Sequence, residues 1–354
     1  MPFFYHLAVA YFCRTFYSAR YKRKRGRMSF ETNKHEARTS AQPVKDTLRK
    51  VPTLSLKDYT HGSDEQKNQF ILGLFNGIKD YGFIILKDHP VRAELINRAY
   101  EILEAFYKLP TEAKLKYVSP AGGGQKGYTA FGKEHAKDAS VMDLKEFYHV
   151  GRETETEKNI WPTEMPEFKL IFSQLYNDLE KAGLIMMEAL TGPLQVEKDF
   201  FTKMVTGGVS ILRLLHYPPI PEGVDPRCLR AAPHEDINFI TLLPAATASG
   251  LQLKDRNGEW LDIVSENNTL IVDAGDMLAR LTNDVIPSTT HQVVNTEEGR
   301  FKSRFSMPFF MHPRPEASLD CLASCRGEGE KYPPITAGQF LTQRLIEIGL
   351  LPKQ

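Results

Sequence analysis

The residues with the clearest chemical potential lie between Pro233 and Leu242, where His234 and Asp236 stand two positions apart. An apolar, β-branched run follows them, which is typical of a β-strand. Residues i and i+2 of a strand share a face, so both side chains can point into one cavity. An imidazole and a carboxylate placed in this way form half of a metal site.

A second histidine, His291, lies on another predicted strand and completes a set of two imidazoles and one carboxylate. Such a set occupies one face of an octahedron and leaves the opposite positions open, which is the arrangement of non-haem Fe(II) oxygenases. Zinc with three protein ligands also fits these residue types, so ligand type alone leaves the metal open. The alternative interpretation is that each of the three is an ordinary solvated or core polar residue.

Arg304 and Ser306 argue against that alternative, because they again stand two positions apart, beyond His291, with Phe305 on the opposite face. A guanidinium fork can donate two parallel hydrogen bonds to a carboxylate, and a neighbouring hydroxyl can donate a third. An arginine aimed into a metal cavity therefore predicts an acidic co-substrate that bridges the two.

Arg213 is a candidate substrate contact. It lies in the apolar run that leads to Tyr217 and shares that residue's face, since the two are four positions apart on a predicted strand. A structural ion pair is the alternative for Arg213.

The composition narrows the class of partner. The 354 residues include 45 Lys+Arg and 44 Asp+Glu, and this balance gives no support for nucleic acid or an anionic membrane as a general partner. A small-molecule substrate is therefore expected, and the oligomeric state stays open. The four cysteines do not form a disulfide framework in so long a chain. Reduced thiols are expected, which favours a cytoplasmic protein.

The elements that position these residues begin after a leader. Residues 1–27 run from an aromatic, apolar stretch into a basic run, the reverse of the order in a secretory signal. The apolar part is shorter than the roughly 20 residues that a membrane helix needs, so stable membrane insertion is not expected. A weak interfacial anchor is the alternative. Residues 30–49 are polar and without period, and we predict a flexible or non-structural leader over 1–50.

Periodicity organises the remainder. Helical spacing of apolar residues predicts helices over 64–79, 91–107, 168–190 and 337–351, and strand patterns mark 51–56 and 82–87. After Gly208, many short apolar runs alternate with turn signals such as Asn257-Gly258, which predicts a sandwich or barrel with a jelly roll as its simplest form. The glycine-rich segment 119–148 is predicted to be a loop whose Tyr128, Lys145 and Phe147 could line a lid.

The ordered set His234-Glu-Asp236, His291 and Arg304-Phe-Ser306 resembles the HxD…H…RxS signature of the 2-oxoglutarate/Fe(II)-dependent dioxygenases, in their isopenicillin N synthase-like branch. Further segments after Val51 carry the likeness: Tyr81-Gly-Phe-Ile-Ile-Leu with His89, Phe106 to Lys114, Asp143 to Tyr148, Tyr217-Pro218, Gly258-Glu-Trp260, Ala274-Gly-Asp276 and Leu281-Thr-Asn283. The chain departs from the family at Leu215, where Asn is frequent, and at Glu235, which strand alternation turns away from the metal.

The resemblance implies a set of cofactor residues: His234, Asp236 and His291 for Fe(II), and Arg304 and Ser306, helped by Tyr217, for the distal carboxylate of 2-oxoglutarate. It implies that O₂ and 2-oxoglutarate are co-substrates, with ascorbate as a supporting reductant. The implied reaction is hydroxylation, desaturation or ring closure of a small organic substrate. The alternatives are a 2-oxoglutarate-independent Fe(II) oxidase of the isopenicillin N synthase type and a non-catalytic ligand-binding module on the same fold.

The expected fold is mainly β with flanking helices, with a double-stranded β-helix (jelly roll) core and an N-terminal α/β subdomain. The predicted divisions after the leader are an N-terminal α/β and helical subdomain over 51–200, the catalytic core that holds Fe(II) and 2-oxoglutarate over 201–315, and a C-terminal segment with a helix over 316–354.

Overall fold

The computed structural model describes residues 51–119, 125–134, 141–348 and 351. The leader predicted over 1–50 lies outside the described residues. The strands are β1 (Thr53–Ser55), β2 (Phe83–Lys87), β3 (Gly127–Thr129), β4 (Glu146–Gly151), β5 (Ile211–Tyr217), β6 (Ala231–His234), β7 (Ile240–Pro244), β8 (Leu251–Lys254), β9 (Trp260–Asp262), β10 (Leu270–Ala274), β11 (His291–Val293), β12 (Arg304–Ser306) and β13 (Phe309–Met311).

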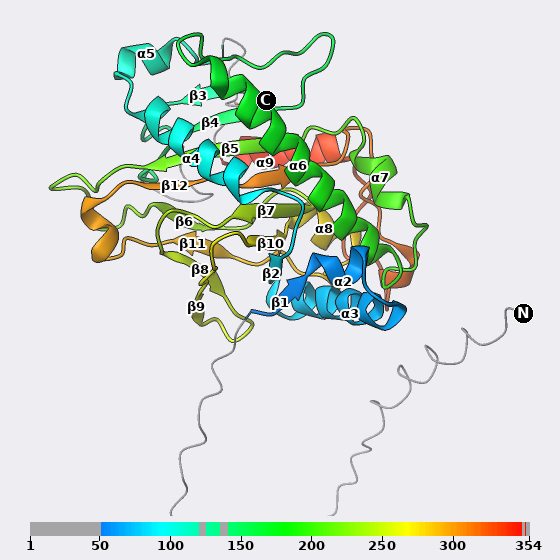
Figure 1. The fold of residues 1–354 in the computed structure, drawn as a ribbon. Helices are drawn as coiled ribbons and strands as arrows, with labels where there is room; N and C mark the ends of the chain where they lie inside the picture. Colours follow the sequence, from blue (N-terminus) through cyan, green and yellow to red (C-terminus); the bar gives the residue numbers. More distant parts are fainter. Residues whose placement is uncertain (1–50, 120–124, 135–140, 349–350, 352–354) are drawn as a thin grey trace, which may run out of the picture. The chain divides into compact units, whose positions relative to one another are not determined.

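The helices of the described residues are mostly long at the N-terminal side and short within the β core (Figure 1). They are α2 (Leu56–Thr60), α3 (Asp64–Tyr81), α4 (Ala93–Tyr107), α5 (Thr111–Leu115), α6 (Pro166–Thr191), α7 (Phe200–Val205), α8 (Asp276–Leu281) and α9 (Ala337–Glu347), with 3-10 turns η1 (Glu298–Phe301) and η2 (Ala323–Cys325). None of the helices in these ranges combines the length and the hydropathy that crossing a bilayer requires.

Two sheets form the β core. Nine of the described strands make a large sheet in the order β1-β2-β10-β7-β13-β5-β4-β3, with β12 also paired to β5. Four others make a small sheet in the order β6-β11-β8-β9. Apolar side chains from both sheets pack together between them, among them Leu215, Leu243, Leu251 and Val293. This arrangement confirms the predicted mainly β, jelly-roll fold with an N-terminal α/β region.

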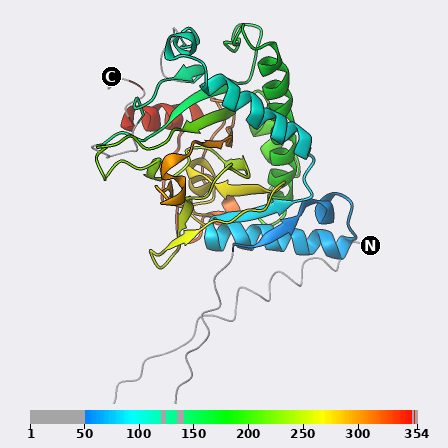
Figure 2. The same cartoon turned by 60° about the vertical axis from the view of Figure 1, so that its left-hand side comes forward.

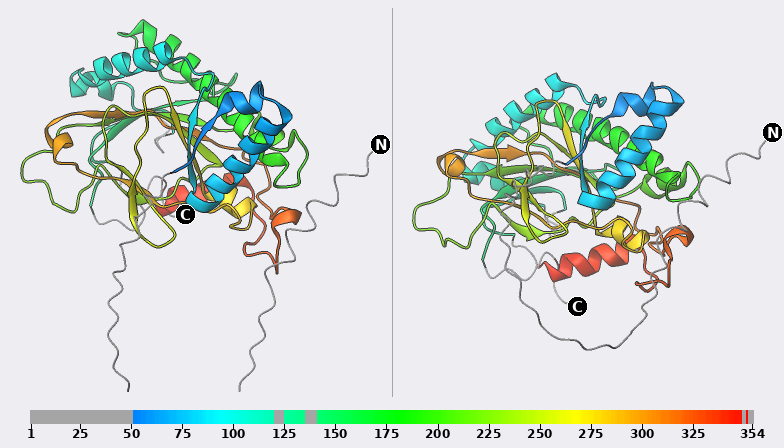
Figure 3. Two further views of the ribbon diagram at one scale, coloured as in Figure 1. Left: turned by 60° about the horizontal axis from the view of Figure 1, so that its bottom comes forward. Right: turned by 90° about the horizontal axis from the view of Figure 1, so that it is seen from below.

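Helices α4 and α6 cover the outer face of the large sheet (Figure 2). Figure 2 shows α4 and α6 running along that face, and Figure 3 shows α9 on the opposite side of the β layers. Helix α6 buries Phe168, Phe172 and Leu179 in the main core. It approaches β13 closely at Gly183, where an added Cβ would lie 2.3 Å from Cε of Met311, so a larger residue would require the Met311 side chain to move. Helix α6 thus packs directly against the outer face of the large sheet.

Local sequence explains where several elements start and stop. Helix α3 begins after Ser63, whose hydroxyl and amide form a capping box with Gln66, and it ends at Gly82 with φ of 72°. Strand β1 pairs only with β2 and lies at an edge, as Pro52 predicts. The hairpin predicted at Asn257-Gly258 joins β8 to β9.

Strand β4 is a difference from the sequence prediction, which assigns its residues to the end of a loop. β4 pairs with β5 along its full length and is buried throughout. Strands β1 to β4, from the N-terminal half, thus belong to the same sheet as the core strands β5, β7, β10, β12 and β13. The subdomain boundaries proposed from the sequence stay a prediction.

Candidate active site

Strands β6 and β11 of the small sheet bring the two histidines together. In this antiparallel pair His234 lies directly opposite His291, and the centroids of their rings are 4.4 Å apart. Strand β6 ends at His234, so Asp236 reaches the pair from the following loop and not from the shared strand face that the sequence predicts. The turn is held by the amide of Asp276, which donates to the carbonyl oxygen of Asp236 at 2.7 Å.

One oxygen of Asp236 faces both imidazoles. Oδ1 lies 3.9 Å from Nε2 of His234 and 3.8 Å from Nε2 of His291. One ligand atom from each of the three residues can be chosen so that all lie within 4.8 Å of one another, and no other such group occurs among the described residues. This spacing suits three protein ligands around one ion.

Hydrogen bonds to the backbone orient the imidazoles. Nδ1 of His234 donates to the carbonyl of Ala232 at 2.7 Å, and Nδ1 of His291 donates to the carbonyl of Thr289 at 3.1 Å. These bonds fix the tautomer, so each Nε2 presents its lone pair to the space beside Asp236. Burial and the proximity of His291 lower the pKa of His234 to about 4, which keeps that imidazole neutral at physiological pH.

The second oxygen of Asp236 is held by Thr241, whose hydroxyl donates to Oδ2 and accepts from Nδ2 of Asn238 at 2.9 Å. Burial alone would raise the pKa of Asp236, but the neighbouring imidazoles and the Thr241 hydroxyl hold it below its usual value. Asp273 on β10 behaves oppositely, because burial and the charge of Asp236 raise its pKa well above the usual range. Asp236 is therefore the ionised member of this carboxyl pair.

Arg304 and Ser306 lie on β12, in the large sheet, and line the same cavity as the histidines and Asp236. Arg304 is 2% exposed, its Nε donates to the carbonyl of Ala248 at 3.1 Å, and its guanidinium carbon lies 5.1 Å from the ring centroid of Tyr217. Nη1 of Arg304 is buried without a hydrogen-bond partner. Among the described residues no carboxylate forms an ion pair with it.

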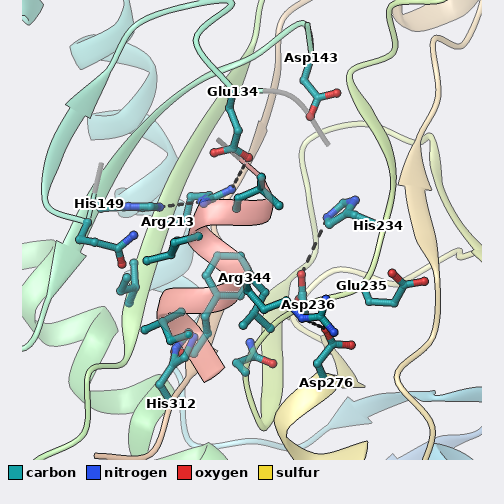
Figure 4. Close-up of a pocket in the computed structure, with 18 of the residues that line it drawn as sticks. Glu134, Asp143, His149, Arg213, His234, Glu235, Asp236, Asp276, His312 and Arg344 are labelled. Carbon is teal, nitrogen blue, oxygen red and sulfur yellow. Dashed lines mark hydrogen bonds and ion pairs between the residues drawn. The ribbon is translucent and has the colours of Figure 1, made fainter. Parts of the chain in front are cut away.

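A cavity of about 390 Å³ adjoins this centre (Figure 4). His234, Asp236, Lys145, Arg213 and Phe310 border both spaces. Helix α9 forms one wall of the larger cavity through Leu341, Arg344, Leu345 and the adjoining Ile348, and β5, β4 and the loop after β6 form the others. The position of the cavity beside the three candidate ligands makes it the candidate substrate site.

A buried ionic network lines one wall of this cavity. Nη1 of Arg213 lies 3.1 Å from Oε1 of Glu134, and Nζ of Lys145 lies 2.9 Å from the same oxygen and 2.8 Å from Oδ2 of Asp143. Nε of Arg213 donates to Nε2 of His149 at 2.6 Å. Arg213, predicted either to contact substrate or to form a structural ion pair, forms the ion pair and also lines the cavity.

The structure places the remaining residues named from the sequence in different surroundings. Lys145 lines the cavity as expected of a lid residue, whereas Phe147 packs in the inter-sheet core under the guanidinium of Arg213, and Tyr128 donates to Glu146 behind β4. Glu235 comes just after the end of β6, so strand alternation does not set its direction; it is exposed, accepts from Thr290 and borders the larger cavity.

Sequence reasoning missed several polar residues of the site, among them Glu134, Thr241 and Asp273. Asp273 carries a usable signal, because it is an acid inside the otherwise apolar strand β10. The nearby Gly275, however, favours the interpretation of Asp273 as a turn residue. Glu134 carries no such signal, since its partners are distant in sequence.

Comparison with protein families matches two segments of the chain. Residues 51–167 match the family described as non-haem dioxygenase in morphine synthesis N-terminal, and residues 208–313 match the 2OG-Fe(II) oxygenase superfamily. The chain is 31% identical over 274 residues to the 2-oxoglutarate-Fe(II) type oxidoreductase hxnY of Emericella nidulans, which covers 72% of this chain and 78% of that protein.

Two solved structures are similar over most of the chain. A 2OG-Fe(II) oxygenase family protein from Caulobacter crescentus is 41% identical with a TM-score of 0.75, over 84% of this chain and 99% of that one. A full-length Neurospora crassa protein, solved in complex with alpha-KG and thymine, is 30% identical with a TM-score of 0.77, over 85% of this chain and 97% of that one.

Proposed function

Because the chain belongs to the 2-oxoglutarate/Fe(II) oxygenase superfamily and is a dioxygenase that couples O₂ and 2-oxoglutarate decarboxylation to oxidation of a small substrate, we propose a role for each residue of its site. His234, Asp236 and His291 hold the Fe(II). Arg304 and Ser306 hold the distal carboxylate of 2-oxoglutarate, with Tyr217 beside them.

The observation that carries this proposal is the buried, unpartnered Nη1 of Arg304 in the cavity that also holds the three candidate ligands. A buried guanidinium without a counter-ion is costly, so the folded chain leaves a place that an anion completes. Ser306 shares the face of Arg304 on β12 and adds a hydroxyl donor. The donor set for the ion fits as well, since two imidazoles and one carboxylate suit Fe(II) and leave open positions.

Each residue then has a defined task. When bound, Fe(II) supplies the reduction of O₂ that drives oxidation of the substrate. Thr241 keeps one oxygen of Asp236 occupied, so that the other faces the ion. Tyr217 lies against the guanidinium of Arg304 and fixes its plane. The apolar side chains of Leu243, Leu251 and Val293 border this space and exclude water from it.

The substrate enters the cavity of about 390 Å³ beside the candidate ligands. The Neurospora relative was solved with thymine and with 5-formyluracil, and we propose a free small molecule of comparable size for this chain and not a nucleic acid. The nearly balanced charge of the chain supports this choice. We also propose a cytoplasmic location, which the free thiols of Cys228, Cys321 and Cys325 support.

The test is release of succinate from 2-oxoglutarate by the purified full chain in air, with Fe(II) and ascorbate. We expect slow release without substrate, and much slower release from Arg304→Ala when 2-oxoglutarate is supplied near the KM of the wild type. Equal release by wild type and Arg304→Ala would contradict the assignment of Arg304. Failure of the wild type to bind 2-oxoglutarate would favour an oxidase that takes its electrons from the substrate.

A further inference from the structure

The cations that line the substrate cavity are already paired. Among the described lining residues, Arg213 and Lys145 share Oε1 of Glu134 at 3.1 and 2.9 Å, and Nζ of Lys145 lies 2.8 Å from Oδ2 of Asp143. The side chains of Lys145 and Asp143 are 5% and 4% exposed, so water weakens these pairs little. The network contains two cations and two anions and carries no net charge.

The described part of the opposite wall holds no spare cation either, because its one arginine lies between two carboxylates and Glu235 adds a further acid to the lining. Nε of Arg344 on α9 lies 3.4 Å from Oδ2 of Asp276, and Nη1 lies 2.6 Å from Oε2 of Glu347. Burial lowers the pKa of His312 to about 4, which keeps that imidazole neutral. An acidic substrate would therefore bury a charge for which the described walls hold no spare cation, and that is unfavourable. A cationic group placed at Glu134 would lie beside the guanidinium of Arg213, so this edge favours a neutral N–H donor.

Arg213 is also fixed in orientation. Its guanidinium carbon lies 4.4 Å from the ring centroid of Phe147 and 5.3 Å from that of Phe310, and Nε donates to His149 at 2.6 Å. The faces of the guanidinium are thus occupied by aromatic rings. Only its edge is directed to polar partners, beside Glu134.

Glu134 supplies the complementary atom. Its side chain is 10% exposed, and while Oε1 accepts from Arg213 and Lys145, Oε2 is buried without a hydrogen-bond partner. A buried carboxylate oxygen without a donor is destabilising, and it is satisfied when a ligand brings an N–H group. Glu134 therefore offers an acceptor next to the guanidinium edge of Arg213, which offers donors.

We propose that the substrate is a neutral molecule with an N–H donor beside a carbonyl acceptor, the edge found in lactams, cyclic imides and related heterocycles. Glu134 accepts from the N–H and Arg213 donates to the carbonyl, so the pair determines specificity beside the candidate iron centre. This inference rests on the proposed function, because it places the substrate in the cavity next to His234, Asp236 and His291.

The test is calorimetric titration of the full chain, supplied with Fe(II) and 2-oxoglutarate and kept free of O₂, with matched compounds. Two scaffolds serve: uracil with dimethyluracil and orotate, and 2-pyridone with N-methyl-2-pyridone and 2-pyridone-5-carboxylate. We expect the neutral N–H compound of at least one scaffold to bind about 10-fold or more tightly than its N-methylated and carboxylated partners.

The variant Glu134→Gln should invert this preference, because it leaves Arg213 and Lys145 with one carboxylate fewer. Affinity for the N–H compound should fall about 10-fold or more, and affinity for the carboxylated compound should rise. Glu155→Gln, at an exposed glutamate, is the matched control and should bind like wild type. Affinity for 2-oxoglutarate should be equal in all three proteins.

Tighter binding of the acids by wild type, equal binding within each scaffold, or no binding by either scaffold while 2-oxoglutarate still binds would overturn the inference. The wild-type comparison stands even where Glu134→Gln does not fold. Loss of 2-oxoglutarate binding in wild type is a different result, since it refutes the proposed function itself.

Discussion

His234 and His291 are direct partners across the antiparallel strands β6 and β11, with ring centroids 4.4 Å apart. Because cross-strand partners point to the same face of a sheet, this register places both imidazoles over one point. Asp236 lies in the loop after β6. Its Oδ1 is 3.9 Å from Nε2 of His234 and 3.8 Å from Nε2 of His291. A shift of one residue in the register of β11 would place His291 on the other face of the small sheet and separate it from His234 and Asp236.

Asp236→Ala should abolish tight Fe(II) binding. Loss of an outer-shell partner of a metal ligand typically weakens metal binding 10- to 100-fold, so loss of the ligand itself should weaken it by more than about 100-fold. Iron content after dialysis measures this effect, and circular dichroism checks the fold. Asp262→Ala, at an exposed aspartate on β9, is the control and should keep its iron. Unchanged iron affinity in Asp236→Ala would refute the ligand assignment.

Arg304→Ala should raise the KM for 2-oxoglutarate roughly 30-fold or more, since removing one partner of a buried charge pair costs about 2 kcal/mol at least. Arg304→Lys keeps the charge but loses the fork, so its KM should lie between those of wild type and Arg304→Ala. Ser306→Ala should have the smallest effect. An Arg304→Lys variant indistinguishable from Arg304→Ala would mean that charge contributes little to the binding of the co-substrate.

Neutral His312 should make the folded state sensitive to acid. Its pKa is lowered by burial from 6.5 to about 4, so below pH 6.5 the unfolded chain binds a proton that the folded chain does not. The contribution of His312 to stability is therefore complete above pH 6.5 and is lost as pH falls toward 4. Between pH 7 and pH 5 this loss amounts to about 2 kcal/mol.

The variant His312→Asn should remove that part of the pH dependence. Chemical denaturation of wild type and variant at a series of pH values gives the two free energies of unfolding. The control is His61→Asn, at an exposed histidine, which should keep the wild-type slope. Parallel pH profiles for wild type and His312→Asn would show that the pKa of His312 is the same in the folded and the unfolded chain.

Arg344→Met should weaken substrate binding without affecting 2-oxoglutarate. Nε of Arg344, on α9, lies 3.4 Å from Oδ2 of Asp276, and both residues line the substrate cavity. Helix α9 does not border the space around Arg304. Methionine retains most of the aliphatic stem and removes the ion pair, so the KM for substrate should rise a few-fold. A matching rise in the KM for 2-oxoglutarate would indicate that α9 supports the whole site.

The sequence allowed prediction of those site residues whose position depends on local pattern. His234, Arg304 and Ser306 lie on strands whose alternation sets their face, and the Asn257-Gly258 turn sets a hairpin. Glu134 could not be predicted, because its role arises from an ion pair with Arg213, 79 positions away. Strand β4 could not be predicted for a similar reason, because the first residue of this strand is polar and buried.

That residue is Glu146, which is buried and paired with Lys114 at 2.8 Å and with His216 at 2.7 Å. A strand that buries charged residues has neither an apolar run nor a regular alternation, so periodicity gives no signal for it. Only the tertiary partners make its burial acceptable. Residues whose environment is supplied by distant segments are thus the ones that sequence patterns do not place.

The most direct test of the account is a crystal structure of the full chain grown without O₂ in the presence of Fe(II) and 2-oxoglutarate, with iron located by its anomalous scattering. We predict one iron ion bound by His234, Asp236 and His291, and the distal carboxylate of 2-oxoglutarate on Arg304 and Ser306. Iron bound elsewhere, or a co-substrate carboxylate placed on Lys145 and Arg213 with Nη1 of Arg304 still unpaired, would contradict the account.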